Sequence, residues 1–274
     1  MYSQPRTAKK TDIRTITVHG QRLRIAIDPG NGSRTPLLLM NGLGVNLEIF
    51  QTFVDELDGA REIIRFDAPG IGGSSLPAIP YTFPSLAYLV AQMLDHLSYT
   101  QVDVLGVSWG GALAQQFALQ HCLRCRRLIL ASTATGSIMI PGRLSALAEL
   151  ATPQRYTEPD YLKEADPDLS SKDLRSESRI VWETAPAMRS GGSAGYMYQV
   201  LAIMGWTSLP WLWLLRQPTL ILAGREDPIV RPINAKIMQR LIPHAKLYLY
   251  NGGHMGLLTH KKELAHIVEQ FLVA

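Results

Sequence analysis

The chain has 274 residues, of which 46% are hydrophobic, and a formal net charge of +4 at pH 7. This length suits one large α/β domain with an insertion and allows a sizeable core. The basic residues form no patch with interleaved aromatic residues, so we expect no nucleic-acid partner. No apolar run reaches the roughly 20 residues that cross a bilayer. Residues 1–12 are expected to be a flexible tail without a signal-peptide core, so the sequence predicts a cytoplasmic protein with no transmembrane segment.

Two cysteines, Cys122 and Cys125, stand in a C-x-x-C spacing. This spacing occurs in redox sites and in zinc sites. The chain has no second cysteine pair, and these two follow a helix-forming run rather than a metal-binding pattern. We therefore expect free, reduced thiols, as is usual in the cytoplasm, and neither a metal nor a cofactor.

The first part of the chain alternates between strand-type and helix-type segments. The runs 11–18 and 21–27 are predicted to form an antiparallel hairpin at a sheet edge. The run 36–40 is apolar throughout, as in a strand that is buried on both faces. Helices are expected over 46–57 and 85–98, and further strands over 62–67, 102–107 and 127–132. Ser85 is expected to be the N-cap of its helix.

Two glycine-rich loops follow predicted strands. The first, Asn41-Gly42-Leu43-Gly44, leaves backbone N–H groups at the carboxyl end of a central strand, where ligands bind in open α/β sheets. The second covers 68–75 and lacks the Gly-Lys-Ser/Thr order of a phosphate-binding loop, so we expect no nucleotide there. Asp67, just before it, is expected to order the loops around the site.

The pattern Gly106-Val107-Ser108-Trp109-Gly110 lies between a predicted strand and a helix-forming run. A G-x-S-x-G pattern in this setting is typical of a nucleophile elbow, a sharp turn that exposes the serine. The two glycines are needed because side chains there would collide as strand and helix close up. The sequence therefore predicts Ser108 as a nucleophile. The alternative is a glycine-rich turn that binds an anion or only packs.

The alternation stops after residue 133 and resumes near residue 216. Helices are predicted here over 143–151, 174–184 and 196–204, separated by prolines and glycines. We therefore expect a core of residues 13–135 and 216–274, with a helical lid inserted at 136–215.

This insertion is rich in aromatic and sulfur-containing side chains. Most are expected to pack against one another, and a few to line an apolar acyl pocket, since ligand sites are mostly hydrophobic with few polar groups. The residues predicted to bind substrate, in the lid and beside the loops, are Asn41, Met188, Tyr196, Trp206 and Met255.

The last part of the chain is expected to contain strands over 218–223 and 245–250 and helices over 231–241 and 261–273. Asp227 follows the first of these strands, and His254 follows the second in a glycine-flanked loop. A serine nucleophile needs a base and an orienting group, and imidazole, with a reference pKa of about 6.5, is suited to the base. We predict Ser108, His254 and Asp227 as the catalytic residues, with Glu226 as the alternative acid.

Two backbone amides are predicted to form an oxyanion hole. One is the N–H of Trp109, just after the nucleophile, and the other is the N–H of Leu43. Because the donors are amides, substitution of the Leu43 or Trp109 side chain should reduce activity less than loss of Ser108.

Several motifs together resemble the α/β-hydrolase superfamily, and more narrowly its intracellular medium-chain-length polyhydroxyalkanoate depolymerases. These motifs are M-N-G-L-G from Met40, D-A-P-G-I-G-G-S-S from Asp67, G-V-S-W-G-G from Gly106, L-A-G-R-E-D-P from Leu222, and G-G-H-M from Gly252. The narrower likeness lies in Trp109, in the segment from Arg189 to Tyr196, and in Gly205-Trp206-Thr207-Ser208. Asn41 stands where many members of the superfamily have histidine.

The resemblance implies a mostly parallel central sheet with helices on both faces and an inserted helical lid. It also implies hydrolysis of 3-hydroxyacyl polyesters through an acyl-enzyme, contact with the surface of a polymer granule, and the same triad and oxyanion positions. A serine rather than aspartate or cysteine at the elbow argues against a haloalkane dehalogenase, an epoxide hydrolase or a polyester synthase. The alternatives left open are a small-molecule carboxylesterase or lactonase, a 3-hydroxyacyl transferase, and a non-enzymatic binding protein with this fold.

Overall fold

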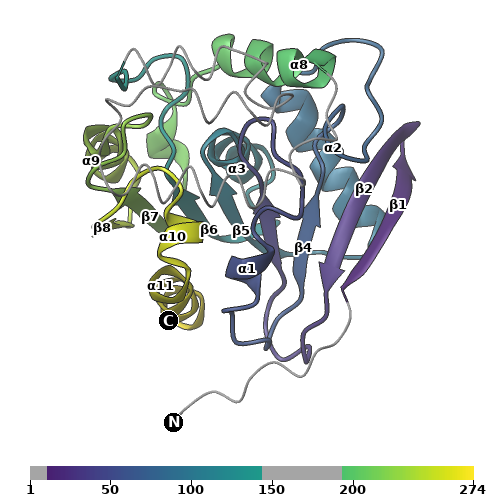
Figure 1. The fold of residues 1–274 in the computed structure, drawn as a ribbon, viewed down its shortest axis with the longest axis horizontal. Coiled ribbons are helices and arrows are strands. Elements are labelled where there is room, and N and C mark those ends of the chain that lie inside the picture. The colour runs from purple at the N-terminus through teal and green to yellow at the C-terminus, as the bar shows by residue number, and fades with distance from the viewer. Residues whose placement is uncertain (1–10, 144–192) are drawn as a thin grey trace, which may run out of the picture.

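The computed structural model describes residues 11–143 and 193–274 of the chain. In these ranges eight strands form one sheet in the order β1-β2-β4-β3-β5-β6-β7-β8 (Figure 1). The strands are β1 (Asp12–Val18), β2 (Gln21–Asp28), β3 (Leu37–Met40), β4 (Ile63–Phe66), β5 (Val102–Val107), β6 (Cys125–Ala131), β7 (Thr219–Gly224) and β8 (Ala245–Tyr250). The β1–β2 and β2–β4 pairs are antiparallel, and the other neighbours are parallel. The expected edge hairpin and mostly parallel sheet are confirmed.

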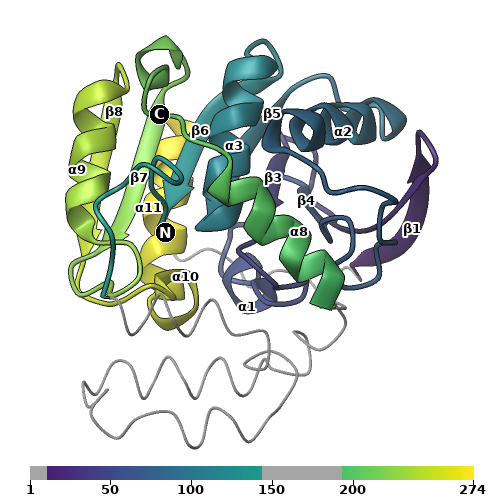
Figure 2. The ribbon, with the colours of Figure 1, turned by 90° about the horizontal axis from the view of Figure 1, so that it is seen from above.

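Helices cover both faces of the sheet (Figure 2). The helices in the described ranges are α1 (Gln51–Val54), α2 (Phe83–His96), α3 (Trp109–Gln120), α8 (Ser193–Met204), α9 (Pro232–Leu241), α10 (Gly256–Thr259), α11 (Lys261–Val273) and the short 3-10 helix η1 (Leu212–Leu214). One apolar cluster joins the sheet to α2, α3 and α9, and a second joins it to α1, α10 and α11. Because both faces are covered, every residue of β3, β4, β5 and β7 is buried. None of the described helices is long and apolar enough to cross a membrane.

The expectation of a helix over 46–57 is wrong for most of that range, because α1 is confined to Gln51–Val54. The backbone of Leu47 is held by tertiary partners. Its N–H donates to Asp67 Oδ1 at 2.7 Å, and its carbonyl accepts from Arg65 Nη1 at 2.8 Å. These bonds stand in place of a helical ladder, so the segment before α1 forms turns.

The N-cap of α2 is Thr82 rather than Ser85. Thr82 Oγ1 accepts from the Ser85 N–H at 3.4 Å, and Ser85 Oγ accepts from the Thr82 N–H at 3.0 Å. The two residues form a capping box, in which each satisfies a backbone donor of the other. Ser85 is therefore the third residue of the helix, and the apolar Phe83 extends the helix ahead of it.

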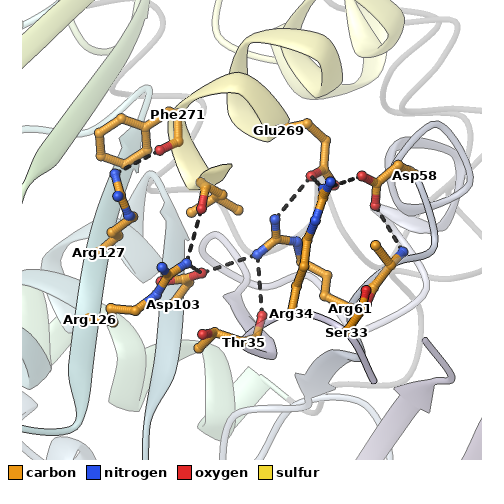
Figure 3. Close-up of polar contacts among 12 residues, drawn as sticks. Ser33, Arg34, Thr35, Asp58, Arg61, Asp103, Arg126, Arg127, Glu269 and Phe271 are labelled. Atoms are coloured by element: carbon orange, nitrogen blue, oxygen red, sulfur yellow. Dashed lines mark hydrogen bonds and ion pairs between the residues drawn. The ribbon is translucent and has the colours of Figure 1, made fainter. Parts of the chain in front are cut away.

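A buried network of charged side chains lies at the amino ends of the central strands (Figure 3). Asp103 in β5 accepts from Arg61 Nη1 at 3.1 Å and from Arg126 at 2.6 and 2.9 Å. Arg61 also donates to Glu269 of α11 at 3.0 Å, and Arg126 donates to the carbonyl of Leu272 at 3.0 Å. The Arg61 and Asp103 side chains are fully buried. This network fixes the last helix to the base of the sheet.

The last part of the predicted insertion, from residue 193 to residue 215, packs on the sheet domain. Trp206, Leu212 and Leu215 belong to the cluster that contains α2 and α3, and Gly136 forms a bridge with Thr207. Most of the predicted lid, including the helices expected over 143–151 and 174–184, lies outside the described residues, and so does most of the expected tail. The division into core and lid therefore stays a prediction.

Candidate active site

Ser108 occupies a strained turn between the end of β5 and the start of α3. Its backbone has φ 52° and ψ −115°, in the region that favours glycine. A Cβ at Gly106 would overlap the Gly110 carbonyl oxygen, and a Cβ at Gly110 would overlap the Met40 carbonyl oxygen. Gly106 therefore lets β5 and α3 close on the serine, as predicted, whereas Gly110 lets α3 approach the end of the neighbouring strand β3.

The structure brings the three predicted catalytic side chains together. His254 Nε2 lies 3.1 Å from Ser108 Oγ, and His254 Nδ1 lies 2.8 Å from Asp227 Oδ2. The other Asp227 oxygen accepts from the N–H groups of Ile229 and Val230 at 2.9 and 2.8 Å. With Nδ1 donating to the carboxylate, Nε2 is the ring nitrogen that can accept a hydrogen bond from Ser108 Oγ.

The acid is buried and the alternative acid is not. The Asp227 side chain is 1% exposed, whereas Glu226 lies on the surface. The geometry therefore selects Asp227 as the partner of His254.

Close packing of two loops sets the distance between the acid and the base. A Cβ at Gly224 would overlap the carbonyl oxygen of Gly252, so the two backbones touch there. The N–H of Glu226 donates to the Gly252 carbonyl at 3.1 Å, and Tyr250 OH donates to the Gly253 carbonyl at 2.9 Å. The loops after β7 and β8 are thus held as one unit that carries both side chains.

The loop after β3 lies against the nucleophile. A Cβ at Gly42 would stand 3.7 Å from Ser108 Cβ. In the described part of the chain, the backbone N–H groups of Leu43 and Trp109 have no hydrogen-bond acceptor, while the N–H of Gly44 donates to Gln199 Oε1 at 2.7 Å. Trp109 is the first residue of α3, where N–H groups have no partner within the helix. The role of these two N–H groups as oxyanion donors stays a prediction.

Asp67 joins the segment before α1 to the glycine-rich loop 68–75. Its fully buried carboxylate accepts from the N–H groups of Leu47 and Gly73 at 2.7 and 2.8 Å and lies 3.3 Å from Arg24 Nη1. Burial raises the pKa of Asp67, and its backbone donors and Arg24 oppose that change. Gly72, at φ +54°, has no room for a Cβ because the Asp67 carboxylate occupies that space.

The residues predicted to bind substrate have different surroundings. Asn41 is 8% exposed, and neither polar atom of its side chain has a hydrogen-bond partner among residues 11–143 and 193–274. Tyr196 is buried and Met255 is half-buried. Met188 lies outside the described residues. Their roles in substrate binding stay predictions.

Trp206 is packed in the apolar core. Its ring lies 4.9 Å from that of Phe83 and 5.7 Å from that of Trp211, between centroids. Its indole N–H donates to Gln116 Oε1 at 2.8 Å. These contacts account for its burial, so a further role in substrate binding stays a prediction.

Sequence reasoning missed three glutamines that connect the elbow helix and its loops to the segment after residue 192. Gln116 binds Trp206, as above, and Gln115 accepts from Ser208 Oγ at 2.6 Å. Gln199 contacts both Gly44 and Trp109. A weak signal was present, since Gln115 and Gln116 stand side by side in an otherwise apolar helix.

Metal-binding groups and reactive thiols are not found near the elbow in the described ranges. No three His, Cys, Asp or Glu side chains there are grouped so that they could hold a metal ion. Cys122 is exposed, Cys125 is buried, and both are free thiols. Burial raises the pKa of Cys125, so this thiol stays protonated and unreactive.

Comparison with known proteins gives consistent matches. A family model described as the alpha/beta hydrolase fold matches residues 35–261. The chain is 45% identical to a poly(3-hydroxyalkanoate) depolymerase of Ectopseudomonas oleovorans, over 94% of this chain and 92% of that protein. It is 27% identical to 3-oxoadipate enol-lactonase 2 of Acinetobacter baylyi, over 88% and 89% of the two chains. Among solved structures, an enol-lactonase from Burkholderia xenovorans superposes with a TM-score of 0.82 at 23% identity, over 95% of this chain and 100% of that one, which shows the shared fold.

Proposed function

The chain belongs to the α/β-hydrolase fold family, as its motifs predicted, and we propose that it is a serine ester hydrolase with Ser108, His254 and Asp227 as its catalytic residues. The observation that carries this proposal is the continuous hydrogen-bonded chain from Asp227 through His254 to Ser108. A serine hydroxyl is a weak nucleophile until a base takes its proton, and the base must be held in one tautomer and orientation. The three side chains meet these needs in turn.

In the first half of the reaction, Ser108 Oγ attacks the carbonyl carbon of the ester and its proton passes to His254 Nε2. The carbonyl oxygen becomes an oxyanion and accepts hydrogen bonds from the N–H groups of Leu43 and Trp109. Each such donor is typically worth about 10²–10³ in rate. Collapse of this intermediate breaks the bond to the alcohol oxygen, which takes the proton from His254 and leaves an acyl group on Ser108.

In the second half, water attacks the acyl carbon and gives its proton to His254. The same two amides accept the new oxyanion. Its collapse returns the proton to Ser108 Oγ and releases the carboxylic acid. Throughout, Asp227 stabilises the imidazolium form of His254, and the N–H groups of Ile229 and Val230 hold the carboxylate in place.

We further propose that the substrate is an apolar 3-hydroxyacyl polyester of medium side-chain length, or its oligomers. The main support is 45% identity to a poly(3-hydroxyalkanoate) depolymerase over nearly the full length of both chains. A hydrolase of this kind releases 3-hydroxy acids. It attacks an ester whose acyl and alcohol parts both carry alkyl groups, so an apolar binding surface is needed.

An exposed apolar stripe on α8 supports binding at the surface of a polymer granule in the cytoplasm. Met197, Leu201 and Met204 follow a spacing of four and three residues, which places them on one face of the helix. They are 47%, 47% and 68% exposed. Exposed apolar patches of this kind mark interaction surfaces, and the surface of a polyester granule is apolar.

The test is an assay on an amorphous suspension of medium-chain polyester, with short-chain polymer and p-nitrophenyl octanoate measured in parallel. We expect release of 3-hydroxy acids from the medium-chain polymer, and no release by Ser108→Ala. If the protein cleaves the small ester well but releases no acid from either polymer, the polymer proposal fails. A small-molecule esterase or lactonase would then remain, the function that the enol-lactonase match favours.

A further inference from the structure

Gln199, in α8, contacts both segments that carry the two proposed oxyanion donors. Its Oε1 accepts from the N–H of Gly44 at 2.7 Å, and its backbone carbonyl accepts from Trp109 Nε1 at 2.9 Å. The residue is 1% exposed, and both hydrogen bonds are buried. One residue of the predicted insertion therefore binds the loop after β3 and the first residue of α3 at the same time.

The bond to Gly44 fixes the position of the neighbouring Leu43 amide. Gly44 has φ +71°, so the chain turns sharply directly after Leu43. On the other side of Leu43, Gly42 lies against Ser108. The donor loop is thus held between Ser108 and Gln199, and a loop freed from Gln199 could rotate its Leu43 N–H away from the oxyanion position.

Helix α8 is itself fixed, so Gln199 has a defined position. A Cβ at Gly195 would overlap the carbonyl oxygen of Gly70, which places the two backbones in direct contact. One turn of helix further on, the Tyr198 ring meets the edge of Tyr81 at 6.3 Å between centroids. These contacts hold the helix against the loops around the site (Figure 1), so the Gln199 amide serves as a rigid anchor for the Gly44 N–H.

We propose that Gln199 is a positioning residue of the oxyanion hole, which couples α8 to both donor amides. This inference rests on the proposed function and adds a residue outside the triad and the donor loops. Gln199 acts through Leu43 and Trp109, so its loss should weaken binding of the transition state more than binding of the ester.

The test compares Gln199→Leu, which removes the acceptor, with Gln199→Glu, which keeps an oxygen at the same place. Complete loss of one oxyanion donor typically costs about 10²–10³ in rate, and a displaced donor should cost part of this. We expect Gln199→Leu to lower kcat on p-nitrophenyl octanoate by about 10- to 100-fold with KM changed by less than about threefold. Gln199→Glu should restore kcat to within about fivefold of the unmodified protein.

A second readout is the affinity for an alkyl trifluoromethyl ketone, whose adduct with Ser108 carries the oxyanion. Its affinity should fall by the same factor as kcat, because both depend on the donors. The matched control is Gln217→Leu, since Gln217 is also a buried glutamine and donates to the Ala118 carbonyl at 2.8 Å at the far end of α3. This control should lower the melting temperature and leave kcat unchanged.

The outcomes separate the inference from the proposed function. All rates are expressed per serine titrated with a p-nitrophenyl phosphonate. Wild-type kcat and ketone affinity in Gln199→Leu would overturn the inference and leave the proposed function intact, whereas ester hydrolysis by Ser108→Ala would overturn the proposed function. If Gln199→Leu does not fold, Trp109→Phe removes the second bond and keeps the backbone amide. Unchanged kcat and ketone affinity in that variant would equally overturn the inference.

Discussion

Replacing Asp103 with alanine should destabilise the protein strongly and leave its chemistry unchanged. Asp103 is fully buried and accepts hydrogen bonds from Arg61 and Arg126 (Figure 3). Burial raises the pKa of Asp103 even though both guanidinium groups oppose that change. Buried ion pairs are in general weak net sources of stability, because the cost of removing the charges from water offsets their attraction.

Breaking the network is nevertheless costly, because it leaves the fully buried Arg61 with Glu269 as its remaining charged partner and removes the carboxylate that Arg126 binds. Removing one member of a buried ion pair typically costs about 3–5 kcal/mol. With a shift of about 2–4 °C per kcal/mol for domains of 150–250 residues, the melting temperature should fall by about 6–20 °C. Asp103 and Ser108 lie at opposite ends of β5, about 16 Å apart along an extended strand, so kcat should stay within about twofold.

Thermal unfolding followed by circular dichroism gives the melting temperature, and hydrolysis of p-nitrophenyl octanoate at 25 °C gives kcat. The control is Asp12→Ala, which breaks the exposed pair of Asp12 with Arg14 and should change the melting temperature little, since such pairs contribute about 0–1 kcal/mol. A fall of less than about 2 °C for Asp103→Ala would refute the reasoning on burial. A tenfold loss of kcat would refute the separation of the network from the site.

Three further changes test the site itself. Asp227→Asn should lower kcat by on the order of 10⁴-fold with little change in KM, because His254 loses its orienting acceptor; steady-state kinetics measure this, and a loss below tenfold would contradict the assignment. Gly110→Ala should lower the free energy of unfolding by about 3 kcal/mol or more. Its control is Gly205→Ala, whose Cβ would meet nothing closer than 3.6 Å. This control should unfold at nearly the same urea concentration as the unmodified protein. Leu43→Ala keeps its amide, so its kcat should fall by less than about tenfold; a loss near the 10²–10³ of a missing donor would show that the side chain matters as much as the N–H.

The sequence was sufficient to predict that Ser108, His254 and one of the two acids Glu226 and Asp227 lie together, because each follows a predicted strand directly. The carboxyl ends of parallel strands meet at one edge of a sheet, so placement along the chain implied placement in space. The choice between Glu226 and Asp227 needed the structure, since it depends on which carboxylate is buried beside His254 and held by backbone donors.

The sequence did not predict the turns before α1 or the role of Gln199, and in both cases the cause is contact between residues that are distant in sequence. Leu47 is in a segment with helical spacing, yet its backbone binds Asp67 and Arg65. Gln199 gave no signal, because a single glutamine in a helix has no motif and its partners, Gly44 and Trp109, are distant in sequence.

The most direct test of the central claim is to locate the covalent adduct of a p-nitrophenyl alkylphosphonate by mass spectrometry. We expect one phosphonate per chain, attached to Ser108, with ester hydrolysis lost in proportion to labelling. We also expect much slower labelling in His254→Ala, because the base is missing. A label on another residue, or hydrolysis that continues after Ser108 is fully labelled, would contradict the account.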